Sequence, residues 1–224
     1  MMLNSLMRQF APVTRPVGLH WHHFEQPDIL PPIVHLSRTA DPTQAEPDKI
    51  VAYLPFENAL EICELFRRFP DKRFFVYHPQ LNDRDEGNLC LRRISHEGFK
   101  ADLFTAAGVV CNSGFELISE CLQWQKKIFA KPLGGQMEQL SNAAALEQLG
   151  YATVVDTLDA VQLRRWLDAP PSPIRIHYPD VAKALARWIV AGQREEVWQL
   201  AHGLWEQSSL PFAGPAQSRI NARR

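Results

Sequence analysis

The segment from residue 109 to residue 120 carries the residue types that bind a nucleotide. A β-branched run, Gly108 to Cys111, ends in a small polar loop, and a helix is expected to begin at Gly114. The free N–H groups and the positive dipole end of such a helix start bind phosphate. Glu116 and Glu120 follow four residues apart on one helix face, where a carboxylate can accept hydrogen bonds from a ribose diol. The segment therefore predicts a nucleotide diphosphate site on an α/β domain.

A second glycine-containing segment, residues 131–143, follows the next expected strand. It passes Gly134 and Gly135 and enters a helix that starts with Glu138 and Gln139. Because ligands of parallel α/β sheets bind at the carboxyl ends of the strands, both segments are expected to line one edge of the sheet. A carboxylate beside an amide suits sugar hydroxyls. Glu138 could instead serve only to cap the helix and complement its dipole.

Short apolar runs alternate with amphipathic stretches from Lys49 onward, which predicts right-handed βαβ crossovers and a parallel sheet. Near-continuous apolar runs are typical of strands buried on both faces. The expected strands are 49–54, 73–78, 88–92, 109–111, 127–131 and 152–155, with a charged loop at 82–87. The expected helices are 59–69, 99–107, 114–124 and 138–149, then 158–167, 179–191 and 195–207 after the sheet.

The composition divides the chain into three parts. Residues 1–48 are rich in proline and carry enough aromatic residues to pack on another surface, as a linker or strap. Residues 49–207 are expected to form a Rossmann-like nucleotide-sugar-binding domain with tail helices, and residues 208–224 a frayed tail. The predicted fold class is α/β, with a single Rossmann-like domain built on a parallel sheet, plus C-terminal helices.

Charge and cysteine usage exclude several classes of protein. The chain has 24 Lys and Arg residues against 25 Asp and Glu residues, so we expect no electrostatic binding to nucleic acid or to an anionic membrane. The four cysteines, Cys63, Cys90, Cys111 and Cys121, lack zinc or disulfide spacing and predict reduced thiols in a cytoplasmic protein. No apolar run reaches the length of a transmembrane helix, and residues 1–10 contain no signal-peptide core.

The ordered set of motifs resembles the donor-binding, C-terminal half of GT-B glycosyltransferases. The motifs are Ser113-Gly114 with Glu120, then Pro132, Glu138-Gln139 and Asn142-Ala143. They are similar to the lipid-II N-acetylglucosaminyltransferase and to the (Asp/Glu)-Gln-x-x-Asn-Ala ending of the UDP-glucuronosyltransferases. The run from Ile50 to Val155 most resembles a bacterial and archaeal family of glycosyltransferases, and the resemblance extends over residues 17–205.

The resemblance implies roles for individual residues. The backbone of Ser113, Gly114 and Phe115 would hold the diphosphate, and Glu120 would bind the ribose hydroxyls. Glu138 and Gln139 would contact the donor sugar. The loop 94–99 would read the base, with the aromatic ring of Phe99 beside it and His96 as a further candidate. Glu116 has no acidic counterpart in the better-known relatives and would be either a sugar contact or a surface residue.

Histidines near the N-terminus have no comparable support as ligands. His20, His22 and His23 could in principle bind a metal, but no carboxylate cluster or cysteine accompanies them at a fixed spacing. GT-B transfer usually needs no bound metal. We therefore expect a hinge or a domain contact from these residues, with no metal and no cofactor.

The sequence departs from the GT-B pattern in two places. Residues 54–58 stand where relatives often carry a glycine-rich phosphate loop but contain no glycine, so this loop contributes side chains or phosphate is held mainly at Gly114. Asn58 is expected to be a helix N-cap. No second set of strands precedes Lys49, whereas a GT-B enzyme has an N-terminal domain that binds the acceptor and usually supplies the base. No catalytic base is predicted, and the apolar surface is expected to be exposed or covered by self-association.

Three functional hypotheses follow. The leading one is the nucleotide-sugar-binding domain of an inverting glycosyltransferase, which takes a hexosyl group from a UDP-sugar to the hydroxyl of an unknown acceptor. The second is a catalytically silent nucleotide-binding or regulatory module. The third is an enzyme similar to nucleotide-sugar 2-epimerases, which ranks lower because the ending Glu138-Gln139-x-x-Asn142-Ala143 belongs to the transferases.

Overall fold

A seven-stranded sheet organises the larger part of the chain, with strand order β5-β6-β4-β3-β7-β8-β9. The computed structural model describes residues 15–34, 44–172 and 174–210. The strands are β3 (Glu46–Tyr53), β4 (Arg73–Tyr77), β5 (Arg84–Glu86), β6 (Leu89–Arg92), β7 (Ala106–Asn112), β8 (Lys127–Lys131) and β9 (Thr153–Val154). All pair in parallel except β5, which pairs antiparallel with β6. After β3 the chain adds strands on one side of it, through β4, β6 and β5, and from β7 onward it adds them on the other side. The pair β3 and β7 is therefore the topological switch point of a doubly wound sheet.

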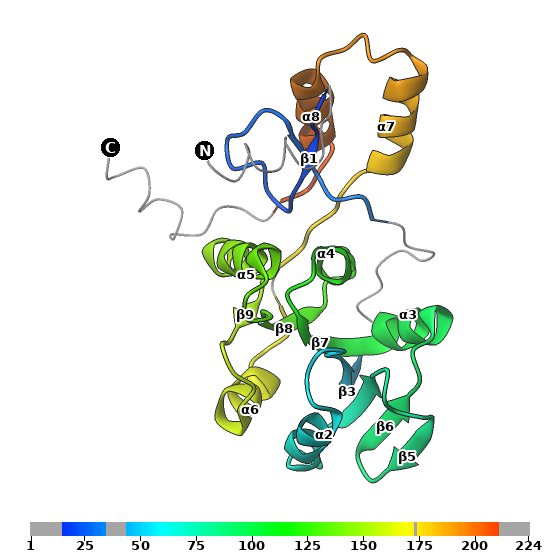
Figure 1. The fold of residues 1–224 in the computed structure, drawn as a ribbon, viewed down its shortest axis with the longest axis vertical. Helices are drawn as coiled ribbons and strands as arrows, with labels where there is room; N and C mark the ends of the chain where they lie inside the picture. The colour runs from blue at the N-terminus through cyan, green and yellow to red at the C-terminus, as the bar shows by residue number, and fades with distance from the viewer. Residues whose placement is uncertain (1–14, 35–43, 173, 211–224) are drawn as a thin grey trace, which may run out of the picture. The chain divides into compact units, whose positions relative to one another are not determined.

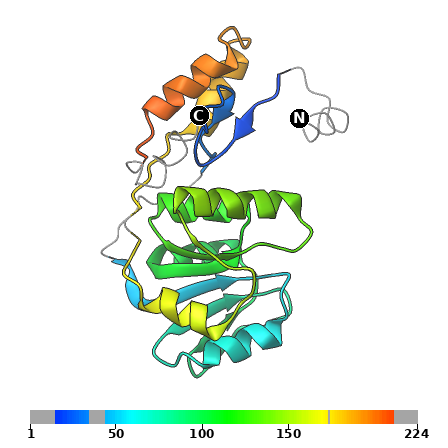
Figure 2. The same ribbon diagram turned by 90° about the vertical axis from the view of Figure 1, so that its left-hand side faces the viewer.

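Helices cover both faces of this sheet (Figure 1). One face carries α3 (His96–Thr105), α4 (Phe115–Gln123) and α5 (Met137–Leu149), and the other carries α2 (Ala59–Arg67) and α6 (Ala160–Asp168), as the view turned by 90° also shows (Figure 2). The architecture confirms the predicted α/β class with a Rossmann-like parallel sheet. The helices that follow β3 and β7 leave on opposite faces, so their first turns flank the switch point.

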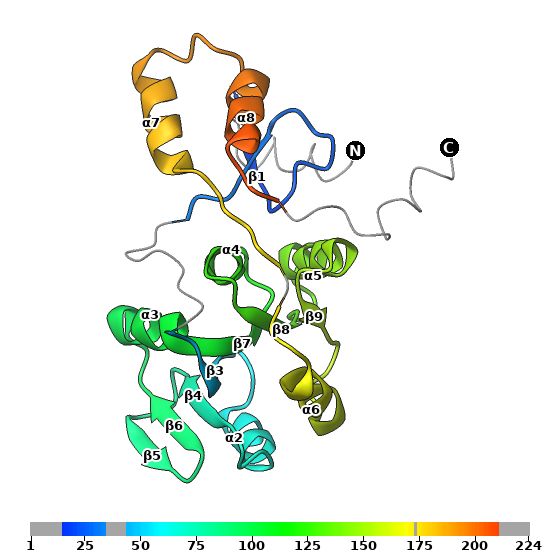
Figure 3. The ribbon, with the colours of Figure 1, turned by 180° about the vertical axis from the view of Figure 1, so that it is seen from behind.

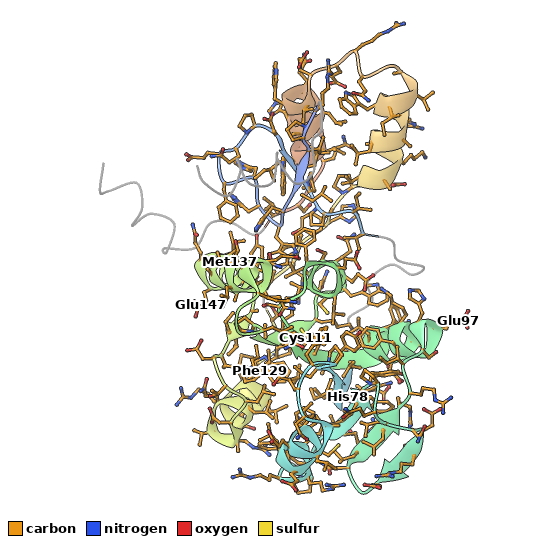
Figure 4. All side chains as sticks on the ribbon, viewed as in Figure 1. His78, Glu97, Cys111, Phe129, Met137 and Glu147 are labelled. Carbon is orange, nitrogen blue, oxygen red and sulfur yellow. The ribbon has the colours of Figure 1, made fainter. Side chains whose placement is uncertain are left out.

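The hydrophobic core on the α2–α6 face closes around large side chains. Phe66 stacks on Phe74 with ring centroids 4.3 Å apart, and Trp166 of α6 packs against Phe129 of β8 at 5.5 Å. Cys111 and Phe129, on the adjacent strands β7 and β8, and His78, just after β4, mark the middle of the sheet in Figure 4. Full burial raises the pKa of the Cys111 thiol to about 12, so that thiol stays protonated. The four cysteines predicted to be reduced are free.

Two local features differ from the sequence prediction. Within the expected charged loop 82–87, residues 84–86 form the edge strand β5, because Leu89 and Leu91 of β6 offer a backbone partner to this polar segment. The helix expected from Phe99 begins earlier, at His96, because the Ser95 side chain accepts a hydrogen bond of 3.2 Å from the Gly98 N–H and caps it. Ser95 therefore fixes the orientation of the loop in front of α3.

A second, smaller unit combines the described residues 15–34 with residues 177–209. Its described elements are β1 (Gly18–Leu19), β2 (Ile29–Leu30), α7 (Val181–Val190) and α8 (Val197–Glu206). The view from behind shows α7, α8 and β1 (Figure 3). Sequence reasoning had assigned the tail helices to the Rossmann-like domain. In the structure their apolar faces instead pack around Leu30, with Trp188 and Leu204 among the buried residues. The Trp205 indole donates a 2.7 Å hydrogen bond to the carbonyl of Ile29.

The expected strap and frayed tail lie only partly within the described residues. Residues 46–48 belong to β3 rather than to a linker. Ser209 pairs with His177 through an isolated antiparallel bridge, so the chain is still ordered at that point. Residues 1–14, 35–43 and 211–224 lie outside the described part of the chain.

Candidate functional site

The helix that follows β7 begins without a side-chain cap. Gly114 is its N-cap residue with φ −70° and ψ 138°, and it has no side chain that could cap the helix. Gln136, the N-cap residue of α5, makes no capping hydrogen bond through its side chain. By contrast, Asn58, Ser95 and Asp159 cap α2, α3 and α6 through their side chains. The two helices of this unit whose N-cap residue makes no side-chain hydrogen bond are thus the two that sequence reasoning assigned to ligand binding.

The space beside Gly114 is open. A Cβ atom added to Gly114 would meet no atom within 4 Å, so neither packing nor a left-handed backbone requires glycine there. Gly135, in the second loop, does need glycine for its φ of +80°. Glycine is a common N-cap residue in its own right, and the open space would also let a ligand approach the backbone closely. An open helix start of this kind has the geometry that suits an anion.

A hydrogen-bond network joins the two predicted ligand loops. Ser113 Oγ donates to the carbonyl of Gln139 at 2.8 Å, and Asn142 Nδ2 donates to the carbonyl of Ser113 at 2.9 Å. The side-chain oxygen of Gln139 accepts a 3.1 Å hydrogen bond from the N–H of Leu133. All three polar side chains are buried. Ser113 and Gln139 therefore hold the loops together through their side chains, whereas Glu138, next to Gln139, is exposed.

A cavity of about 300 Å³ opens between α3 and α4 and brings several of the predicted site residues together. It is lined by Tyr53, Tyr77, Ile94, Ser95, His96, Phe99, Lys100, Glu116, Leu117 and Glu120. Phe99 sits edge-on to the rings of Tyr53 and Tyr77, at 5.5 and 5.1 Å between centroids. Phe99 in the first turn of α3, with Tyr53 and Tyr77, thus supplies an aromatic end, and the first two turns of α4 supply two carboxylates, Glu116 and Glu120.

Ion pairs fix the walls of this cavity. Glu120 pairs with Lys100 of α3, and the two side chains are 18 and 19% exposed. Asp102 accepts hydrogen bonds from Lys49 at 2.9 Å and from the Tyr77 hydroxyl at 2.5 Å, which ties α3 to β3 and β4. Burial, followed by the hydrogen bond to Asp102, raises the pKa of Tyr77 well above its usual value. Tyr77 therefore remains a neutral hydroxyl donor at physiological pH.

Comparison with protein families decides the assignment. A family model described as glycosyl transferase family 1 matches residues 20–171, more than half of the chain. The chain belongs to glycosyl transferase family 1. The matched region contains all the strands of the seven-stranded sheet and both ligand loops. The resemblance to glycosyltransferases drawn from the motifs is confirmed.

Solved glycosyltransferase structures are similar to this family 1 chain at low sequence identity. The glycotransferase of kitacinnamycin has 20% identity and a TM-score of 0.46, with 82% of this chain and 50% of that chain covered. SnogD from Streptomyces nogalater has 18% identity and a TM-score of 0.41, with coverage of 85 and 43%. MurG of Acinetobacter baumannii has 14% identity and a TM-score of 0.34, with coverage of 79 and 49%. The chain thus spans about half the length of these structures. No curated protein matches it significantly.

Sequence reasoning missed a polar cluster of this family 1 chain at the carboxyl ends of β3, β7 and β8. Lys131 and Glu57 form an ion pair of 2.6 Å, and Asn112 Nδ2 lies 3.3 Å from the same Glu57 oxygen. His78 Nδ1 accepts from the N–H of Gln80, so its Nε2 carries the proton and donates to the Glu57 carbonyl at 3.1 Å. The signal available in the sequence was the position of Asn112 and Lys131 at the ends of apolar runs, with Glu57 in the loop that follows another such run.

Neither a metal cluster nor a membrane-spanning segment is found in the described parts of this glycosyl transferase family 1 chain. Within residues 15–34, 44–172 and 174–210, no group of three or more His, Cys, Asp or Glu side chains could hold a metal ion. Across the same residues, no helix combines the length and apolar character needed to cross a bilayer. His20, His22 and His23 instead pack with neighbouring rings, His22 and His23 stacking at 4.5 Å between centroids.

Proposed function

We propose that the Rossmann-like unit binds a nucleoside diphosphate sugar, with a UDP-sugar as the donor. The observation that carries this proposal is the continuity of the cavity with the start of α4: Glu116 and Leu117 belong both to the cavity lining and to the first turn of the helix that Gly114 opens. A base, a ribose and a diphosphate need three adjoining environments of this kind, one aromatic, one carboxylate and one rich in N–H groups.

Each predicted site residue receives a part in this arrangement. The base lies against Phe99 and the loop 94–99, and the Glu120 carboxylate accepts hydrogen bonds from the ribose hydroxyls. The backbone N–H groups after Gly114 bind the diphosphate. The sugar extends toward Glu138 at the start of α5, with Glu116 as a second carboxylate within reach. Ser113 and Gln139 contribute by holding the two loops in register.

The proposed reaction is an inverting transfer. The acceptor hydroxyl attacks the anomeric carbon, the bond from that carbon to the diphosphate oxygen breaks, and UDP leaves with both bonding electrons. The proton of the hydroxyl passes to a base, whose identity we leave unassigned. N–H groups already aimed at the leaving diphosphate lower the barrier because they need no reorganisation as charge develops.

The acceptor side of the reaction requires a surface beyond the donor site. The large apolar side chains that are exposed in the described Rossmann-like unit all lie at the carboxyl edge of the sheet: Phe56, Leu60, Ile94, Met137, Leu140 and Val161. Each sits in a loop that follows a strand or in the first turn of the next helix. This distribution supports an acceptor-binding domain, or a second copy of the chain, that covers the donor edge.

Calorimetric titration with UDP tests the proposal. We expect the wild-type chain to bind UDP, and Glu120→Ala to weaken binding about tenfold or more, because hydrogen bonds to a charged group are lost. Glu147→Ala is the matched control: Glu147 is exposed at the far end of α5 from Met137 (Figure 4). Absence of UDP binding by the folded wild-type chain would overturn the proposal.

A binding module without transferase activity is the second candidate, because none of the roles assigned above is that of a general base. It predicts UDP binding with neither hydrolysis nor transfer of the sugar. Release of UDP from a UDP-sugar, measured with and without candidate acceptor alcohols, separates the two functions.

A further inference from the structure

The polar cluster after β3, β7 and β8 has a geometry that the donor site described above does not use. Asn112 and Lys131 are register partners on adjacent parallel strands, so their side chains leave the same face of the sheet. Both meet Glu57, whose Oε1 lies 2.6 Å from Lys131 Nζ and 3.3 Å from Asn112 Nδ2. The amide of Asn112 also donates to the Lys131 carbonyl at 3.0 Å. Glu57 and Lys131 are each about one-fifth exposed, so the pair is reachable from solvent.

One atom of this cluster lacks a partner. Asn112 is 7% exposed, and its side-chain oxygen accepts no hydrogen bond from any group in the described part of the chain. Buried amide oxygens in folded proteins are nearly always hydrogen-bonded. A group that only accepts, such as a carboxylate, cannot satisfy this oxygen, whereas a hydroxyl can. The cluster therefore offers a site for an O–H donor beside a lysine.

The α2 side of the switch point also needs a cation if it is to meet phosphate. Asn58 Oδ1 accepts from the N–H groups of Leu60 and Glu61, at 2.9 and 3.3 Å, and so closes the start of α2 to an anion. The loop from Leu54 to Asn58 contains no glycine that would expose its backbone. A cavity of about 250 Å³ opens here, lined by Glu57, Asn58, Glu61, Ile62, Leu65, Lys131, Thr157 and Leu158. Lys131 is the cation among these lining residues.

A purely structural role explains the cluster less well. An ion pair taken partly out of water gains little over apolar packing, since desolvation offsets most of the attraction. The neighbouring side chains on this face, Val110 and Phe129, are apolar and fully buried. Asn112 and Lys131 are the last residues of β7 and β8, at the carboxyl ends where open α/β sheets bind ligands.

We propose that Lys131 binds the diphosphate of the donor, and that Glu57 holds the Lys131 side chain in place before the donor binds. This inference rests on the proposed function. When the donor binds, the Lys131 ammonium exchanges its Glu57 oxygen for a phosphate oxygen. Glu57 and the unpartnered oxygen of Asn112 then accept hydrogen bonds from hydroxyls of the donor sugar. The site thereby replaces the glycine-rich loop that the β3–α2 connection lacks with a lysine from β8.

Titration of the full chain with uridine, UMP and UDP tests the role of Lys131. In Lys131→Gln we expect at least a tenfold loss of UDP affinity, a smaller loss for UMP and an unchanged affinity for uridine. The salt dependence of UDP binding should also weaken, because a phosphate contact is lost. Lys127→Gln is the matched control, since Lys127 stands at the opposite end of the same strand and donates to the Ala169 carbonyl.

The variant Glu57→Gln distinguishes this exchange of partners from a purely structural role of the Glu57–Lys131 ion pair. If Lys131 exchanges Glu57 for phosphate, the variant keeps or improves its affinity for UDP, because Glu57 no longer competes with phosphate for Lys131, while a UDP-hexose no longer binds more tightly than UDP. If the ion pair is purely structural, both single variants lose affinity for uridine and for UDP equally. Should Lys131→Gln fail to fold, Glu57→Gln/Lys131→Gln leaves no lone charge and must show the same selective loss of UDP affinity.

The outcomes distinguish the two levels of the proposal. A folded wild-type chain that does not bind UDP overturns the proposed function together with the role of Lys131. Wild-type binding of UDP with unchanged UDP affinity in Lys131→Gln overturns the role of Lys131 alone and leaves the proposed function standing.

Discussion

The side-chain amide of Asn142 donates a 2.9 Å hydrogen bond to the main-chain carbonyl of Ser113, which precedes it by 29 residues. This bond joins the loop before α4 to the first turns of α5. Because Asn142 is buried, its removal leaves the Ser113 carbonyl without that donor in a region closed to water. The amide group of Asn142 therefore helps to set the relative position of the two helix starts, together with the hydrogen bond from Ser113 Oγ to the Gln139 carbonyl.

We predict that Asn142→Ala lowers the free energy of unfolding by about 1–3 kcal/mol. Urea denaturation followed by circular dichroism measures the change. Ser141→Ala, one position earlier on the exposed side of α5, is expected to change stability by less than about 0.5 kcal/mol. Equal stability of the two variants would show that the Asn142–Ser113 bond does not hold the loops.

Gly114→Ala should separate folding from binding. Its φ of −70° suits alanine and the added Cβ meets nothing, so stability should stay the same or rise by up to about 1 kcal/mol. The methyl group would nevertheless occupy the space that a phosphate needs, so UDP affinity should fall by about tenfold or more. Thermal unfolding and calorimetry on one preparation give both numbers. Unchanged affinity would place the diphosphate elsewhere.

Gly108→Ala, unlike Gly114→Ala, should lower the stability of the fold, because the added methyl group has no room. A Cβ on Gly108 would lie 2.8 Å from the Trp166 ring and 2.9 Å from the Lys127 carbonyl. Since backbone cannot yield cheaply, we expect a loss of about 1–3 kcal/mol in the free energy of unfolding. Urea denaturation of this variant beside Gly114→Ala makes the comparison, and a Gly108→Ala chain as stable as wild type would contradict it.

The buried ammonium of Lys126 predicts a dependence of stability on alkaline pH. Lys126 donates to the carbonyls of Phe104 and Ala106, and its burial lowers its pKa to about 8. The unfolded chain retains the proton up to about pH 10.4. The unfolded state therefore binds more protons between these values, and the free energy of unfolding rises with pH across that window by up to about 3 kcal/mol.

The variant Lys126→Met removes this contribution. The stability of wild type relative to Lys126→Met should increase between pH 8 and pH 10, and stay constant between pH 6 and pH 7. Urea midpoints at half-unit intervals provide the measurement. Parallel curves for the two proteins over the whole range would refute the assignment.

His20 predicts a dependence on acidic pH in the smaller unit. Burial, with a lesser contribution from His22, lowers the pKa of His20 to about 4. The unfolded chain binds this proton near pH 6.5, so the contribution of neutral His20 to stability is lost as the pH falls from about 6.5 to 4. Because Nδ1 of His20 accepts from the Trp21 N–H at 2.9 Å, His20→Asn can retain an acceptor without titrating.

We expect wild type to lose more stability than His20→Asn between pH 7 and pH 4. Urea unfolding followed by tryptophan fluorescence compares the two proteins, and the NMR titration of the His20 ring reports its pKa directly. A ring that titrates near pH 6.5 in the folded chain would contradict the prediction.

Most of the fold follows from local patterns in the sequence. The apolar runs locate the parallel strands, and the resemblance to GT-B glycosyltransferases assigns Phe99 and Glu120 to one site before any coordinates are known. The structure places both in the lining of the same cavity. Their binding roles remain predictions that the UDP titrations test.

Pairings between distant residues were not predictable in the same way. Lys100 and Glu120 pair across two helices, and Glu57 and Lys131 lie 74 residues apart, so no periodicity links them. Strand β5 was not predicted because Arg84, Asp85 and Glu86 have little intrinsic preference for a strand. They form a strand because they pair with the backbone of β6 at the edge of the sheet. The partnership of residues 15–34 with α7 and α8 likewise arises from packing that no local pattern encodes.

The smaller unit draws its parts from the two ends of the described chain, with the whole Rossmann-like unit in between. During synthesis, Leu30 therefore emerges from the ribosome long before the two helices that bury it. The intervening unit can form as soon as α6 has emerged, because its core needs nothing from α7 or α8. The segment around Leu30, in contrast, keeps its apolar side chains exposed until α7 and α8 have been made, which makes it a natural binding site for a nascent-chain chaperone.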